Sequence, residues 1–209
     1  MNLAIDVGVL LATFAVIFPA ELPDKSFIAT LVLATRYPRL WVWLGATLAF
    51  GVQMVIAVLA GQLLSFLPRT LVLGVTAVLF AVGSVILVRG GLRVRAEEEA
   101  EEAEEVAEIA QRAPEGERGL AAFATTFAVI FAAEWGDLTQ LVAAGQAART
   151  DSPLSVLLGA WGALAAVAAI GVLAGAWLQH RVPLWRIRLV SGGLLAVLAV
   201  ITLVELVRG

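Results

Sequence analysis

The sequence has no cysteine, a single histidine (His180) and few charged side chains, which make up 15% of its 209 residues. The absence of cysteine excludes a disulfide framework, a thiolate zinc cluster and a thiol nucleophile. Soluble domains carry about 25% charged and about 45–50% apolar residues, whereas 61% of this chain is hydrophobic. The composition therefore excludes an ordinary soluble domain and predicts an all-α protein that crosses a membrane several times.

The scarce acidic residues are unevenly distributed along the chain. Ten of the seventeen Asp and Glu residues lie between Glu97 and Glu117, which leaves seven for the other parts of the sequence. Residues 94–118 are rich in Glu, Ala and Arg and contain Pro114 and Gly116. This composition is typical of a solvated linker, and we predict one here between two membrane units.

Five stretches are apolar and long enough to cross a bilayer, which takes about 20 residues in a helix. A sixth, at 189–204, is shorter, but the flanking Arg186, Arg188 and Glu205 could reach the headgroups. Two of the six are interrupted midway by acids and are too long for one straight crossing, so each is expected to be a single span that is broken or bent. The predicted organisation is a three-span unit at 1–93, the linker at 94–118 and a second three-span unit at 119–209. The six stretches are 3–35, 40–68, 70–88, 119–148, 152–179 and 189–204.

The arginines predict the orientation. Ten of them lie in the connections that follow the first, third and fifth spans, and three lie on the opposite side. Because positive side chains collect on the cytoplasmic side of a membrane protein, both termini are expected outside and the acidic linker in the cytoplasm.

The two units contain an internal repeat. Residues 13–21 read TFAVIFPAE and residues 126–134 read TFAVIFAAE, so eight of nine positions match at an offset of 113. A repeated unit with three spans enters the membrane in opposite directions in its two copies, which is a recurring transporter design. The small residues at 57/61 and 171/175 are spaced for close helix packing, although facing lipid is an equally good interpretation.

The acids that interrupt the two long spans form a pair of related motifs, Glu21-Leu-Pro-Asp-Lys-Ser26 and Glu134-Trp-Gly-Asp-Leu-Thr139. In each motif the two carboxylates are three residues apart and are expected to share one face of a helix. A helix-breaking residue precedes each Asp, and a hydroxyl follows two residues later. The candidate metal ligands are Glu21, Asp24, Ser26, Glu134, Asp137 and Thr139.

Carboxylate and hydroxyl oxygens favour a hard divalent cation such as Ca²⁺, Mn²⁺ or Mg²⁺. Four ionised acids at membrane depth are costly, and Lys25 alone cannot balance them. Gln53 and Gln140 are further candidate oxygen ligands, although an interhelical hydrogen bond explains each equally well. Carboxylates crowded in a low dielectric hold protons when the metal leaves, so protons are the expected counter-ion. An acidic exterior would then drive metal out of the cytoplasm.

At these motifs the sequence resembles the membrane cation-transporter family that includes the Golgi calcium/manganese transporters and bacterial manganese exporters. The hallmark of that family is a duplicated Glu-x-Gly-Asp-(Lys/Arg)-(Thr/Ser). The resemblance implies transport of Mn²⁺ and/or Ca²⁺ in exchange for protons, with Glu21, Asp24, Glu134 and Asp137 at the ion site and Ser26 and Thr139 at the hydroxyl positions. The sequence departs from the hallmark at Pro23, where glycine is usual, and at Leu138, where a basic residue is usual.

The expected location is the inner (plasma) membrane of a bacterium, with the lipid bilayer, a divalent cation and protons as partners and no nucleic acid. An oligomer is compatible with the sequence. No catalytic residue and no cofactor are expected. Three alternatives remain open at this point: a membrane enzyme of the lipid-pyrophosphate phosphatase type, a structural subunit, and a transporter of another small solute.

Overall fold

The computed structural model describes residues 5–22, 25–64, 66, 68–92, 118–181 and 184–208. All regular structure in these residues is helical, as the composition predicts. The acidic linker at 94–118 lies outside the described residues except for Arg118. The eight helices are α1 (Val7–Glu21), α2 (Lys25–Arg36), α3 (Arg39–Leu64), α4 (Arg69–Leu92), α6 (Leu120–Ala133), α7 (Leu138–Arg149), α8 (Pro153–Arg181) and α9 (Leu184–Arg208).

Two of the expected spans are broken at their acidic motifs. Helices α1 and α2 have 15 and 12 residues, and α6 and α7 have 14 and 12, so each is too short to cross a bilayer alone. The axes bend by 69° between α1 and α2 and by 76° between α6 and α7. Each pair is therefore two half-helices that meet at a break, as the acids within the apolar run indicate.

Within the described residues, three helices are long and apolar enough to cross a membrane unaided, or five spans result if each bent pair counts as one. The expected span at 189–204 lies within α9, which that count does not include. The prediction of six spans is thus supported for five and stays a prediction for the sixth.

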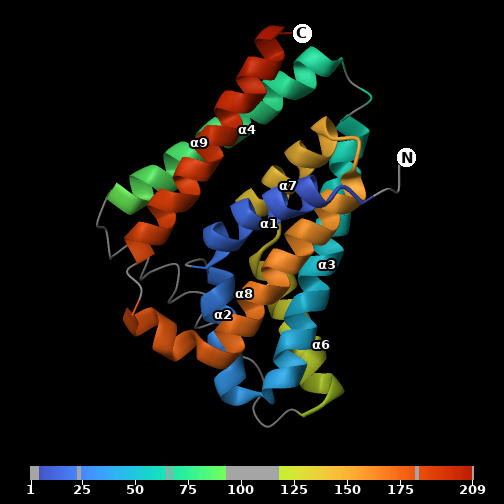
Figure 1. The fold of residues 1–209 in the computed structure, drawn as a ribbon. Coiled ribbons are helices and arrows are strands. Elements are labelled where there is room, and N and C mark those ends of the chain that lie inside the picture. Colours follow the sequence, from blue (N-terminus) through green and yellow to red (C-terminus); the bar gives the residue numbers. More distant parts are fainter. Residues whose placement is uncertain are drawn as a thin grey trace.

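Helix contacts in the two halves correspond closely. Helix α1 packs on α8 as α6 packs on α3, and α2 packs on α8 as α7 packs on α3. Helices α4 and α9 run side by side along one flank of the bundle (Figure 1). The correspondence ends at this flank, where α4 contacts α7 and α9 contacts α1.

The repeated sequence TFAVIF produces the same local packing twice. Phe14 stacks on Phe18 with ring centroids 5.3 Å apart, and Phe127 stacks on Phe131 at 5.5 Å. A Cβ on Gly159 of α8 would lie 3.0 Å from the Cβ of Thr13, and one on Gly45 of α3 would lie 2.9 Å from that of Thr126. These glycines therefore let the long helices α8 and α3 approach the broken helices closely.

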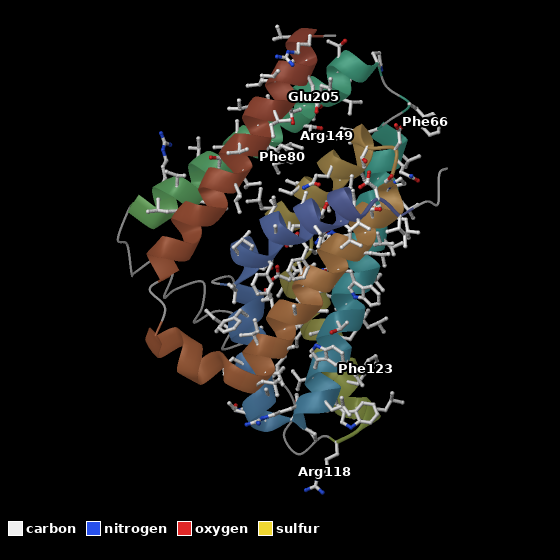
Figure 2. All side chains as sticks on the ribbon, in the orientation of Figure 1. Phe66, Phe80, Arg118, Phe123, Arg149 and Glu205 are labelled. Atoms are coloured by element: carbon white, nitrogen blue, oxygen red, sulfur yellow. The ribbon has the colours of Figure 1, made fainter. Side chains whose placement is uncertain are left out.

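The two ends of the bundle differ in what they carry. Both termini lie at the upper end in Figure 1, and Arg149 and Glu205 lie there too, whereas Arg118 lies at the lower end (Figure 2). Arg149 in the last turn of α7 donates to the Thr202 hydroxyl of α9 and has its guanidinium carbon 5.9 Å from the Phe80 ring centre on α4. These contacts connect α7 to the α4–α9 pair at the upper end.

Candidate metal centre

The breaks bring acids from both motifs together in the middle of the bundle. Glu21 ends α1, and Glu134 and Asp137 flank the break between α6 and α7. Each of these three carboxylates offers an oxygen within 4.8 Å of an oxygen of the other two. Glu21 and Glu134 are 2% and 1% exposed, so the cluster lies in the protein interior.

The spacing of three residues predicted that Glu134 and Asp137 share one face of a helix, and this prediction is wrong. Helix α6 ends at Ala133 and α7 begins at Leu138, so the two acids lie on opposite sides of a non-helical segment. Gly136 makes the segment possible because its φ of +78° is in the left-handed region that favours glycine. The break itself, rather than helical periodicity, brings the two carboxylates together.

Asp137 is the N-cap of α7. Its Oδ1 accepts a hydrogen bond from the backbone N–H of Gln140 at 2.9 Å, which satisfies one of the free N–H groups of the first helical turn. The partial positive charge of this helix end also stabilises the carboxylate. Capping therefore holds the Asp137 side chain in a defined position beside Glu134.

Two hydroxyls orient the Glu21 carboxylate. Ser26 Oγ donates to Glu21 Oε2 at 3.2 Å, and Thr139 Oγ1 donates to Glu21 Oε1. The sequence places these hydroxyls at equivalent positions of the two motifs, and the structure directs both to the same carboxylate. All three residues are at least nine-tenths buried.

Gln140 and Gln53 both hydrogen-bond to the broken span, Gln53 across helices as the hydrogen-bond interpretation predicts and Gln140 locally, within the break that precedes its own helix. Gln140 Nε2 donates to the Glu134 carbonyl, and its Oε1 accepts from Gly136 N at 3.4 Å. Gln53, on α3, donates to the Phe131 carbonyl at 3.0 Å, which is one of the carbonyls left without a helical partner at the end of α6.

Asp24 and Pro23 lie outside the described residues, so the fourth acid of the predicted set stays a prediction. Lys25 begins α2, but its side chain is not described. Five of the six candidate ligands are therefore placed: Glu21, Ser26, Glu134, Asp137 and Thr139.

The arrangement suits a cation for a further reason. The C-terminal ends of α1 and α6 meet at the cluster, and the last turn of a helix leaves backbone carbonyls without an intrahelical partner. Three carboxylates, two hydroxyls and the backbone oxygens of a broken helix are the hard donors that divalent ions such as Ca²⁺ and Mn²⁺ prefer.

Sequence reasoning missed one buried polar contact near the cluster. Thr13 Oγ1 lies 2.9 Å from Gln146 Oε1, between α1 and α7. The pattern that could have found it is the spacing of seven residues between Thr139 and Gln146, which places both on one face of a helix.

Comparison with known proteins agrees with this geometry. Residues 9–94 and 122–209 match a family model described as "Divalent cation/proton antiporter GDT1". The chain belongs to this family. It is therefore a membrane transporter of divalent cations with protons as counter-ion, and the family's activity favours transport over the phosphatase alternative.

Relatives in this antiporter family include a GDT1-like protein of Synechocystis sp., which is 32% identical over 213 residues that cover 97% of both chains. The chloroplast protein PAM71 of Arabidopsis thaliana is 31% identical over 94% of this chain, which spans only 56% of that relative. A GDT1-like protein of Schizosaccharomyces pombe is 24% identical over 88% of this chain and 77% of its own length. No solved structure has significant similarity to the chain.

Proposed function

We propose that the protein exports Mn²⁺ and/or Ca²⁺ from the cytoplasm in exchange for protons, and that the ion binds between the two breaks. The observation that carries the proposal is the convergence of Glu21, Glu134 and Asp137 from two half-helix ends within 4.8 Å. Asp24, Ser26 and Thr139 complete the proposed site. Lys25 is an accessory residue that reduces the negative charge of the site. Gln53 and Gln140 are accessory residues that hydrogen-bond to the break between α6 and α7.

The electrostatics of the cluster support proton exchange. Two unit charges 4.8 Å apart repel by about 3 kcal/mol at an effective dielectric of about 20. Three carboxylates cannot all stay ionised at that cost without a cation. A 2+ ion neutralises most of the charge, and when the ion leaves, protons take its place. Metal and protons therefore compete for the same oxygens, which is the requirement for antiport.

The corresponding contacts of the two halves support two inverted three-helix repeats, with six spans in all. In this arrangement the two breaks meet near the membrane midplane, and each half supplies one broken helix. Both termini are proposed outside and the acidic linker inside, in the plasma membrane. A more acidic exterior then drives protons inward and the metal outward.

The test is flux in proteoliposomes. We expect purified protein to move Mn²⁺ and Ca²⁺ faster than Mg²⁺, because Mg²⁺ sheds its water less readily, and a pH gradient to accelerate uptake into vesicles that are acidic inside. Asp137→Asn should abolish flux while helix content and unfolding temperature stay near those of the parent. Asp151→Asn is the control, since Asp151 is an exposed aspartate outside the site.

Metal flux that ignores the pH gradient and moves no protons would contradict the antiport mechanism. Normal flux in Asp137→Asn would contradict the proposed site and leave the family assignment intact.

A further inference from the structure

A buried polar pair lies between α1 and α7, about two helical turns from the acidic cluster. Helix α1 has only two polar side chains, Thr13 and Glu21, and both contact α7. Glu21 accepts from Thr139, and Thr13 Oγ1 lies 2.9 Å from Gln146 Oε1. Thr13 is 0% exposed and Gln146 is 8% exposed. Both polar side chains of α1 therefore contact α7, and Glu21 also contacts Ser26 of α2.

The amide of Gln146 is not fully used by the protein. Its Nε2 is buried and has no hydrogen-bond partner among the residues that the structure describes. Thr13 Oγ1 also lies 2.8 Å from the Val9 carbonyl, and a hydroxyl has only one hydrogen to donate. If Thr13 donates its hydrogen to the Val9 carbonyl, the Gln146 amide can turn by 180° and donate Nε2–H to the Thr13 oxygen. The amide oxygen of Gln146 then has no partner among the described residues. In both orientations half of a buried amide is without a partner.

The pair lies on a line from the cluster to one end of the protein. Gln146 is two helical turns beyond Thr139 on the same face of α7, or about 10 Å along the axis. The direction is toward Arg149, at the end where both termini lie (Figures 1 and 2). Asp6, the exposed N-cap of α1, precedes Thr13 by seven residues and so lies on the same helical face. Oxygen-bearing groups thus recur about every two turns from the cluster to that end.

The other half of the protein lacks this polar step. At the offset of 113, Thr13 matches Thr126 and Gln146 matches Leu33. Leu33 is fully buried, so an apolar side chain serves for packing at the equivalent position. An unsatisfied polar group within a membrane costs several kcal/mol, which argues against glutamine as a packing choice on the α1–α7 side.

We propose that Thr13 and Gln146 form a second, transient binding position for the divalent cation, between the acidic cluster and the end that carries the termini. The inference rests on the proposed function. The hydroxyl and the amide oxygen replace part of the hydration shell of an ion that has left the carboxylates. Because both ligands are neutral, they hold the ion weakly and release it outward, whereas a carboxylate at this position would hold it tightly.

The experiment compares Gln146→Leu with the parent protein in three measurements. Self-exchange of radioactive Mn²⁺ across proteoliposomes at equal pH on both sides tests the cation path alone. Mn²⁺ affinity in detergent tests the acidic cluster, and thermal unfolding tests the fold. We expect self-exchange to fall about tenfold or more, in line with the loss of one oxygen ligand to the ion. We expect affinity to change less than about twofold, and the unfolding temperature to stay equal or rise, since an unpaired polar group is removed.

Matched variants separate the proposed role from simple packing. Thr13→Ser keeps the hydroxyl and should keep exchange near the parent rate, whereas Thr13→Val should slow it. Thr126→Val is the control. Thr126 is equally buried in the same TFAVIF sequence, and its hydroxyl has no partner in the described part of the chain. It differs from Thr13 in that the residue equivalent to Gln146 in its half of the protein is Leu33.

Three results would overturn the inference. Parent-like self-exchange in Gln146→Leu, with or without a lower unfolding temperature, would make the pair a structural contact. Normal self-exchange with slowed proton-coupled flux would make it a proton path. An equal loss of affinity and exchange would make Gln146 part of the acidic cluster. A parent protein that shows no Mn²⁺ exchange would instead refute the proposed function, so the two failures are distinguishable.

Discussion

At the scale of single residues, the site depends on how each acid is held. Glu21 receives two hydroxyl hydrogen bonds, and Asp137 receives one from the backbone of α7. Hydrogen bonds to a charged group contribute about 1.5–3 kcal/mol. The side chains around the acids therefore decide where the carboxylate oxygens lie before an ion arrives.

Thr139→Val removes one hydrogen bond from Glu21 but keeps the shape of the side chain. We expect Mn²⁺ affinity to fall about tenfold, because the carboxylate is no longer oriented and the loss of one such bond is worth about 1.5 kcal/mol. Thr139→Ser should restore most of the affinity. Isothermal titration of the purified proteins measures the difference, and equal affinities for the valine and serine variants would exclude an orienting role for the hydroxyl.

At the scale of helices, small residues decide how closely the long and broken helices pack. Gly61 of α3 is buried, and a Cβ there would meet the backbone of Ala144 on α7, with the carbonyl carbon at 2.9 Å. A Cβ on Gly171 of α8 would lie 3.1 Å from the Phe27 carbonyl of α2. The alternative that these glycines face lipid is thus wrong at both positions.

Gly61→Ala should push α7 away from α3. Overpacking of this kind costs about 1–3 kcal/mol, so we expect a lower unfolding temperature in detergent and weaker Mn²⁺ binding, since α7 carries Asp137 and Thr139. Gly74→Ala is the matched control, because a Cβ on Gly74 of α4 meets nothing within 4 Å. If both variants unfold at the same temperature, the close approach of α3 and α7 is not required for stability.

At the scale of the whole molecule, the fold shows which helix ends share a side, and the proposed orientation in the membrane rests on the arginines. The start of α1 and the end of α9 lie opposite Arg118, the last residue of the acidic linker (Figures 1 and 2). The arginine distribution independently predicts that the linker side is cytoplasmic.

The absence of cysteine from the sequence makes the orientation easy to test. In intact cells, Asp151→Cys should react with a membrane-impermeant maleimide, because Asp151 is exposed between α7 and α8. Arg118→Cys should react only after permeabilisation. The reverse pattern of labelling would invert the proposed orientation, whereas the direction of exchange would still follow the pH gradient.

Much of the fold was predictable because the bilayer restricts the choices. Apolar runs of defined length, a repeat at an offset of 113 and acids within two of those runs predicted two broken helices and their motifs. The spacing of Glu134 and Asp137 misled the local interpretation, since it assumed a helix through both acids, whereas α6 ends at Ala133 and Gly136 lies in the non-helical segment between them. Periodicity could not show this, because a single left-handed residue leaves no trace in the apolar pattern.

The sequence by itself determined that the chain is a helical membrane protein with two duplicated acidic motifs, since composition and repeats are properties of the chain alone. Only the tertiary structure decided which oxygens meet. Ser26 and Thr139 are 113 residues apart in sequence and equivalent in the repeat, yet both donate to Glu21. The contact between Thr13 and Gln146 likewise arises because α1 and α7 pack together. Contacts between distant segments depend on how helices pack, and one-dimensional patterns do not encode that packing.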